Sequence, residues 1–204
     1  MDNGCNYMSN DFLNIYHICE ESISLGPGVR FVIWVQGCMQ RCKGCISPSS
    51  RSFDINQLLL VEDLAQRIID NKNIQGITIS GGEPFLQATN LSKLLKLVKA
   101  KRPDLNVLVY SGYVIEQLET EKAKIFLSFI DLLIDGPYVD KLKTNKGLRG
   151  STNQRLHFLT DSLVEYEEKL LNGERNNEVF IKDGSVRIVG LPREGIDIEK
   201  FIIK

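Results

Sequence analysis

Runs of apolar residues alternate with polar, charged residues along most of the chain, and their spacing predicts short strands and helices. Residues 29–35, Val-Arg-Phe-Val-Ile-Trp-Val, are mostly β-branched or aromatic, which is typical of a buried strand. Apolar positions at helical spacing predict helices over 58–69, over 91–99 and within 114–129. Further short apolar runs predict strands at 12–19, 74–80, 105–110 and 130–135.

The repeated strand–helix order predicts an α/β fold with a parallel sheet and right-handed crossovers. In such sheets, ligands gather at the carboxyl ends of the strands. Four of the expected strands run into polar loops that contain glycine, and we expect these loops to open onto one face of the molecule. The loops begin at Gly37-Cys38, Ser80-Gly81-Gly82-Glu83, Tyr110-Ser111-Gly112-Tyr113 and Asp135-Gly136.

The pattern changes after Leu156. Residues 162–172 predict a charged helix, and residues 179–181 and 186–189 predict a hairpin, because Asp183-Gly184 suits a type I′ turn. We therefore divide the chain into a core over 1–159 and a C-terminal helix and hairpin appendage over 160–204. The short core is expected to leave one face of the sheet relatively uncovered, which would suit a large protein substrate.

Charge and composition narrow the class of protein. The 204 residues include 25 Lys and Arg against 26 Asp and Glu, and 43% are hydrophobic, as in ordinary globular proteins. A formal net charge of −1 argues against a nucleic-acid partner. No apolar run approaches the roughly 18 residues that span a bilayer, and the first residues do not resemble a secretory signal. We therefore expect a cytoplasmic protein with no membrane partner.

The strongest chemical signal is a run of cysteines with the spacing C-x3-C-x2-C, formed by Cys38, Cys42 and Cys45. Three thiolates so close in sequence can surround one small centre of soft metal ions. A structural iron–sulfur cluster normally takes four cysteines, so three would leave one iron open for a substrate. Two alternatives remain open at this point: a zinc site with Cys5 or Cys19 as fourth ligand, or three cysteines that bind no metal.

The cysteine loop, preceded by a Gly-Pro-Gly-Val-Arg segment and a strand, resembles the radical S-adenosylmethionine (SAM) superfamily. Over about residues 12–158 the chain resembles one branch in particular, the anaerobic ribonucleotide reductase-activating proteins, which are related to the pyruvate formate-lyase activases. The resemblance implies an incomplete (β/α)6-type barrel, here followed by a C-terminal β-hairpin appendage. It extends through Gly81-Gly82-Glu83-Pro84, Tyr110-Ser111-Gly112-Tyr113, Asp135-Gly136-Pro137-Tyr138 and residues 149–155.

This resemblance also implies a reaction. Cys38, Cys42 and Cys45 would hold one [4Fe-4S] cluster, and SAM would chelate the fourth iron through its amino and carboxylate groups. One electron from the reduced cluster would cleave SAM to methionine and a 5′-deoxyadenosyl radical, which takes a hydrogen atom from the substrate. The implied partners are a glycyl-radical enzyme as substrate and a flavodoxin-type reductant.

The residues expected to bind SAM follow from the same resemblance. Gly81 and Gly82 would let the backbone approach the SAM amino group closely, and Glu83 would accept a hydrogen bond from it. Asp135 would bind SAM or a monovalent cation. Tyr110 and Ser111 begin a segment that would line the adenosyl side, and residues 149–155 would grip a carboxylate or a peptide backbone.

Each of these assignments has a simpler alternative in the residues themselves. The Gly-Gly pair could be a turn with a solvated Glu83, the tyrosines could be packing residues, and residues 149–155 could be a solvated basic loop. His17 and His157 are expected to be strand or loop residues rather than catalytic bases. Cys5 and Cys19 are expected to be structural or incidental, and no catalytic residue is assigned.

Three functional hypotheses follow. The first is a radical SAM activase that removes a hydrogen atom from a glycine of a partner enzyme. The second is a radical SAM enzyme that modifies a small molecule or a peptide, with the appendage helping recognition. The third is a metal-binding interaction module without turnover, which would bind metal but not cleave SAM.

Overall fold

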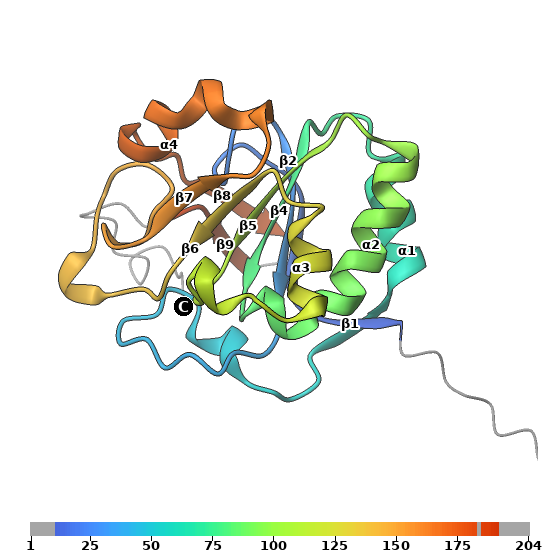
Figure 1. Ribbon diagram of the computed structural model, residues 1–204, viewed down its shortest axis with the longest axis horizontal. Helices are drawn as coiled ribbons and strands as arrows, with labels where there is room; N and C mark the ends of the chain where they lie inside the picture. Colours follow the sequence, from blue (N-terminus) through green and yellow to red (C-terminus); the bar gives the residue numbers. More distant parts are fainter. Residues whose placement is uncertain (1–10, 183–184, 192–204) are drawn as a thin grey trace, which may run out of the picture.

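Seven strands form one sheet in a computed structural model, which describes residues 11–182 and 185–191 (Figure 1). The order of the strands is β3-β1-β2-β4-β5-β6-β7, so β3 and β7 lie at its edges. The strands are β1 (Phe12–Ser22), β2 (Arg30–Val35), β3 (Gln57–Leu60), β4 (Gly76–Gly81), β5 (Asn106–Tyr110), β6 (Leu132–Asp135) and β7 (Arg155–Phe158).

The centre of the sheet is parallel and its margins are antiparallel. Strands β2, β4, β5 and β6 are parallel neighbours, as the strand–helix repeat predicts. Strand β1 is antiparallel to β2 and β3, and β7 is antiparallel to β6. The predicted α/β class is confirmed, but the expectation of a parallel sheet holds only for its centre, because the sheet as a whole is mixed. Strands β1 and β2 are joined by a short turn, which permits only antiparallel pairing, because a parallel pair needs a crossover of a dozen residues or more.

Three helices pack against one face of the sheet: α1 (Val61–Asp70), α2 (Ala88–Lys101) and α3 (Glu121–Leu127). Figure 1 shows them side by side on one side of the strands. Successive side chains of a strand point to opposite faces, so Phe31 and Ile33 join the helices in the main core, whereas Val32 and Trp34 point away from it. No helix in the described residues is long and apolar enough to cross a bilayer.

The second face is covered by the C-terminal part of the described chain, so the expectation of a relatively uncovered face was wrong. This part contains α4 (Glu167–Asn172), β8 (Glu178–Lys182) and β9 (Ser185–Val189). Leu163 and Leu170 pack in one apolar cluster with Leu108, Leu132 and Ile134 of the sheet. Val189 packs with Val32 and Trp34 in another. Sequence periodicity indicates that a helix has an apolar side but not which sheet face it covers.

Glu178 ties the hairpin to the turn that follows β1. The hydroxyls of Ser22 and Ser24 donate hydrogen bonds to its carboxylate at 2.5 and 2.7 Å, and the Ile23 N–H donates at 3.0 Å. Three donors on one carboxylate make a strong attachment, because hydrogen bonds to a charged group are stronger than neutral ones. The hairpin is therefore fixed to the first part of the sheet.

The predicted elements are present, with several differences at their ends. Residues 57–60 form β3 rather than the start of a helix, because they pair with Phe12–Ile15 at the sheet edge. Strand β7 was not predicted, since the alternation of polar Arg155 and His157 with apolar Leu156 and Phe158 extends over only four residues. Residues 161–166 form a 3₁₀ turn before α4.

The predicted hairpin is confirmed by the pairing of β8 with β9. Its Asp183-Gly184 turn, residues 1–10 with Cys5, and residues 192–204 of the appendage lie outside the described residues.

Candidate active site

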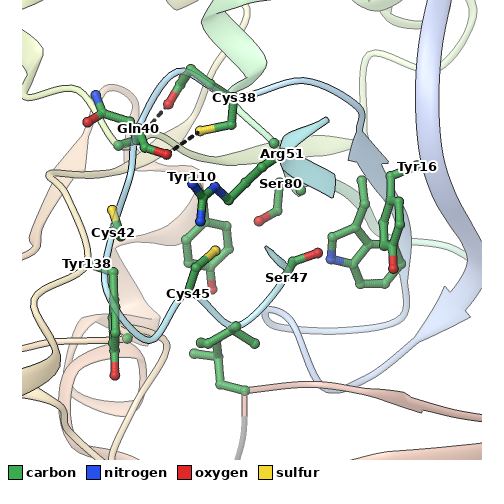
Figure 2. A pocket seen from close by; sticks show the side chains of 18 of the residues that line it. Tyr16, Cys38, Gln40, Cys42, Cys45, Ser47, Arg51, Ser80, Tyr110 and Tyr138 are labelled. Carbon is green, nitrogen blue, oxygen red and sulfur yellow. Dashed lines mark hydrogen bonds between the residues drawn. The ribbon is translucent and has the colours of Figure 1, made fainter. Parts of the chain in front are cut away.

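The cysteine loop and the ends of the central strands line one cavity of about 590 Å³ (Figure 2). As predicted, the loops after β2, β4, β5 and β6 meet on one side of the sheet. A cavity of this volume suits a cosubstrate of drug-like size. The predicted site residues that line it are Cys38, Cys42, Cys45, Gly81, Gly82, Glu83, Tyr110 and Ser111.

Backbone hydrogen bonds hold the start of the cysteine loop against the 3₁₀ turn Pro48–Arg51. The Gly37 N–H donates to the Ser50 carbonyl at 2.8 Å, and the Cys38 N–H donates to the Arg51 carbonyl at 3.2 Å. Gly37 has a φ of +97° and Gly44 a φ of +74°, in the region that only glycine adopts readily. The loop therefore presents its thiols from a defined backbone rather than from an open coil.

The three thiols of Cys38, Cys42 and Cys45 are free and partly buried. Burial raises the pKa of the Cys38 thiol, and a bound metal would reverse this by taking the thiolate. Within residues 11–182 and 185–191, no three His, Cys, Asp or Glu side chains converge as the ligands of a single ion would. In a [4Fe-4S] cluster each thiolate binds a different iron, so the loop fits a cluster better than zinc. Cys19 packs against the apolar cluster that contains Val32 and is not among the residues that line the cavity, so it gives no fourth ligand.

The Gly81-Gly82 pair seats the end of β4 against the cysteine loop. A Cβ on Gly82 would lie 2.2 Å from the Gly37 carbonyl oxygen, and one on Gly81 would lie 2.5 Å from the Val35 nitrogen. The Glu83 N–H donates to the Gly37 carbonyl at 2.8 Å. Positions 81 and 82 therefore require glycine because the backbone of residues 35 and 37 lies so close, whether or not a ligand also approaches them.

Glu83 is 1% exposed, which excludes the alternative of a solvated side chain. Its carboxylate accepts hydrogen bonds from the Phe85 N–H at 3.1 Å, the Ser111 hydroxyl at 3.0 Å and the Gly112 N–H at 2.7 Å. Burial raises the pKa of Glu83 to about 7, although these donors oppose the shift. The carboxyl group is therefore about half ionised at neutral pH, and a cationic group in the cavity would favour its ionised form.

Tyr110 lines the cavity and has a hydroxyl group that is free to form a hydrogen bond. Its hydroxyl is buried and has no hydrogen-bond partner among the described residues. Burial raises the pKa of this phenol, so it stays protonated. Buried hydroxyls usually have a partner, and a ligand in the cavity would supply one.

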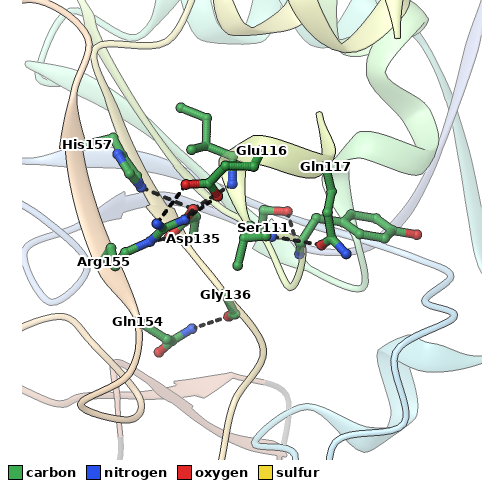
Figure 3. A network of polar contacts seen from close by, with 11 residues as sticks. Ser111, Glu116, Gln117, Asp135, Gly136, Gln154, Arg155 and His157 are labelled. Atoms are coloured by element: carbon green, nitrogen blue, oxygen red, sulfur yellow. Dashed lines mark hydrogen bonds and ion pairs between the residues drawn. The ribbon is translucent and has the colours of Figure 1, made fainter. Parts of the chain in front are cut away.

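Asp135 lies in a network of polar contacts beside the cavity, and it is not among the cavity's lining residues (Figure 3). Arg155 donates to its two oxygens at 3.0 and 2.6 Å, and the Ile115 N–H donates at 2.6 Å. The His157 Nε2 atom lies 3.0 Å from Oδ2. Burial alone would raise the pKa of Asp135, but the Arg155 and Ile115 donors outweigh it and hold the pKa below its usual value. Glu116 also binds Arg155, at 2.8 and 2.6 Å.

The 149–155 segment is internally bonded rather than a solvated loop. Arg149 Nη1 donates to the carbonyls of Thr152 and Gln154, at 3.2 and 3.4 Å. The Gln154 side chain lines the cavity, accepts from the Gly150 N–H at 2.7 Å and donates to the Gly136 carbonyl at 3.0 Å. With Arg155 bonded to Asp135, both arginines of the segment already have partners within the chain.

Several cavity residues were missed by sequence reasoning. His17 stacks on Trp34 with ring centroids 5.4 Å apart, and Arg187 Nη1 of β9 lies 2.7 Å from His17 Nε2. Burial, and then the charge of Arg187, lower the pKa of His17 to about 4, so His17 is neutral and accepts this bond. Arg51 also lines the cavity. None of these residues belongs to a motif, and only the tertiary fold brings them together.

Comparison with known proteins agrees with this geometry. The 4Fe-4S single cluster domain family matches residues 24–157. An anaerobic ribonucleoside-triphosphate reductase-activating protein of Enterobacteria phage T4 is 35% identical over 147 residues, which cover 70% of this chain and 92% of the relative. Proteins with the same description from Vibrio cholerae (35% over 144 residues, 66% of this chain and 91% of the relative) and Escherichia coli K12 (32% over 156 residues, 72% and 99%) are also similar.

The cysteine loop, the Gly-Gly-Glu strand end and the cavity between them thus occur in a chain that matches these relatives over most of their length. The chain belongs to the 4Fe-4S single cluster domain family and, within it, to the family of anaerobic ribonucleoside-triphosphate reductase-activating proteins.

Proposed function

We propose that this protein is a radical SAM activase that generates the glycyl radical of an anaerobic ribonucleotide reductase. The observation that carries the proposal is the meeting of the three cysteines with the Gly81-Gly82-Glu83 strand end in one cavity. A cluster held by three thiolates keeps one iron open, and the cavity beside it has room for a cosubstrate. Membership of the activase family supports the reaction class.

Cys38, Cys42 and Cys45 would hold the cluster. When bound, the cluster supplies the electron that cleaves the SAM sulfonium, giving methionine and the 5′-deoxyadenosyl radical that takes a hydrogen atom from a glycine Cα of the partner. Around it, the residues of this chain bind and orient. Glu83 would accept from the SAM amino group, and the Gly81-Gly82 backbone would lie beside it.

Tyr110 and Ser111 would lie along the rest of SAM. Tyr110 would use its free hydroxyl as a donor, which is the use that its buried, unpartnered state supports. Ser111 already donates to Glu83 and would hold that carboxylate in place. Asp135, which is bonded to Arg155, would act by fixing the β6–β7 edge of the site rather than by touching SAM.

The same proposal covers the barrel-like sheet, the division of the chain, the electron donor and the cellular location. The sheet would act as an incomplete barrel around the cavity, with residues 1–159 as the catalytic core and 160–204 as an appendage. A flavodoxin-type protein would supply the electron. The three free thiols favour the cytoplasm, which is a reducing compartment, as the location of the protein.

The test is an anaerobic assay of the protein reconstituted with iron and sulfide, reduced and given SAM. We expect 5′-deoxyadenosine from the wild type and none from Cys42→Ala. With a candidate reductase present, electron paramagnetic resonance should show a glycyl radical on the partner, and replacing the accepting glycine by alanine should abolish it.

Other outcomes discriminate the remaining hypotheses. 5′-Deoxyadenosine without a radical on any ribonucleotide reductase would favour a small-molecule or peptide substrate. A stable cluster with bound SAM and no cleavage, with or without the partner, would favour a binding module without turnover.

A further inference from the structure

Arg51 places a positive charge beside the three cysteines. It ends the 3₁₀ turn Pro48–Arg51, and its backbone carbonyl accepts from the Cys38 N–H at 3.2 Å. Its side chain lines the same cavity as Cys38, Cys42 and Cys45. Figure 2 shows the Arg51 side chain among those that line this cavity, together with the three cysteines.

This guanidinium has no partner among the described residues. Its Nε atom is buried and makes no hydrogen bond there, and no carboxylate in that part of the chain forms an ion pair with it. The buried arginines of the chain, in contrast, have partners. Arg30 donates to Thr78 and Asn106 at 2.6 Å each, and Arg175 donates to the Gly147 carbonyl at 2.8 Å.

A partly buried cation without a partner is costly, because it loses water and gains nothing in exchange. The cost is removed if an anion occupies the cavity. The same cavity is lined by the three cysteines, which bind a cluster as thiolates. Three thiolates on a [4Fe-4S] core of charge 2+ give a net charge of −1, and reduction by one electron makes it −2.

We propose that Arg51 is the counter-cation of the cysteine-bound cluster and stabilises its reduced form. This inference rests on the proposed function, since it requires that the loop holds a cluster. Arg51 is thus a positioning residue: its positive charge favours the reduced cluster, which carries one more negative charge than the oxidised cluster. Hydrogen bonds and nearby charge are known to set the potential of such clusters.

The test compares Arg51→Gln with the wild type, with Arg51→Lys and with Arg41→Gln. Arg41 is the matched control, because it is exposed on the same loop and is not among the residues that line the cavity. Iron and sulfide are counted first. The reduction potential is then measured anaerobically without SAM, by redox titration followed by electron paramagnetic resonance, so the readout does not depend on turnover.

We expect Arg51→Gln to disfavour the reduced cluster at least tenfold, which is a shift of about 59 mV to more negative potential for one electron. Arg51→Lys should restore much of the shift, and Arg41→Gln should leave the potential close to that of the wild type. If Arg51→Gln retains no cluster, Arg51→Lys decides: a normal cluster supports the charge role, and no cluster in either variant overturns it in favour of packing.

Other results would also overturn the proposal. One is a potential that Arg51→Gln leaves unchanged, or that Arg41→Gln shifts equally. An unchanged potential together with SAM binding at least tenfold weaker would assign Arg51 to the SAM carboxylate instead. A wild type that takes up no cluster at all would remove the proposed function itself and this inference with it, which no variant-specific result would do.

Discussion

The Gly37 carbonyl oxygen lies where a Cβ on Gly82 would have to be, with only 2.2 Å between them. This contact joins the cysteine loop to the end of β4, and the Glu83 N–H bonds the same carbonyl. Any side chain at position 82 must therefore push the loop away. The consequence can be measured as a loss of cluster.

Gly82→Ala should lower the iron content of the reconstituted protein to less than half that of the wild type. It should also reduce the free energy of unfolding by about 2 kcal/mol or more, because the obstructing atom is backbone and cannot turn aside. Gly150→Ala is the control: its Cβ would meet the Tyr138 ring at 3.1 Å and the Gln154 side chain at 3.3 Å, where a small shift suffices. Equal iron content in both variants would contradict this account of the loop.

SAM binding should tighten as the pH rises from 6 to 8. The pKa of Glu83 is raised by burial to about 7, so its ionised fraction grows through this range. If the ionised carboxylate receives the SAM amino group, linkage predicts an affinity gain of about tenfold, with proton release on binding. Anaerobic calorimetry in buffers of different ionisation enthalpy measures both quantities.

Glu83→Gln should bind SAM more weakly and lose this pH dependence, whereas Glu121→Gln, on the exposed side of α3, should behave as the wild type. If Glu83→Gln keeps the wild-type slope, Glu83 serves only to bridge Ser111 and Gly112.

Arg155→Met should lower the urea midpoint of the cluster-free protein at pH 7. The change leaves the buried Asp135 carboxylate without its cation, and breaking such a pair is costly. Because the pKa of Asp135 is lowered in the folded wild type, the stabilisation is present above its unfolded value of 3.8 and is lost as pH falls through the lower folded pKa. The difference between wild type and variant should therefore narrow in acid.

Urea unfolding at several pH values measures this difference, and Glu116→Gln is the matched control. Glu116 contacts the same guanidinium from a side chain that is 62% exposed, so its loss should lower the urea midpoint much less than Arg155→Met does. Similar costs for the two variants would show that the network does not depend on Asp135.

The C-terminal part of the described chain should prove inseparable from the sheet. Removing residues from 160 onward would expose Leu108, Leu132 and Ile134, which now pack against Leu163 and Leu170. We expect the shortened chain to be largely insoluble. Recovery of a soluble, two-state folded protein with a normal cluster would instead establish a detachable appendage.

A milder change tests the attachment of the hairpin alone. Glu178→Ala removes the acceptor of the Ser22, Ser24 and Ile23 donors, so limited proteolysis should cut the hairpin faster while the cluster content stays normal. Unchanged proteolysis would mean that apolar packing alone holds the hairpin.

Local signals in the sequence predicted a good part of this structure. The apolar run of 29–35 predicted β2, helical spacing predicted α2, and the polar, glycine-containing loops at the ends of the expected parallel strands predicted which loops meet. The elements that were not predicted from the sequence are those that form through contacts with residues far away in the chain. Residues 57–60 form a strand only because β1 offers them an edge, and β7 forms because Arg155 and His157 face Asp135.

The site shows the same division. The cysteines were predicted, but Arg51 and Arg187 carry no motif, and their positions follow only from how the chain folds back on itself. Asp135 was singled out correctly as a polar strand end, yet nothing local indicated that Arg155 would occupy its carboxylate.

The position of the hairpin has a consequence for the order in which the protein is made. Residues 187–191 line the cavity that the cysteine loop opens into, yet they leave the ribosome long after Cys45 does. The first strands and the thiols are thus synthesised while this wall is still missing. Until then the cavity lacks the wall that these residues form, so the thiols are less enclosed on that side than in the finished protein.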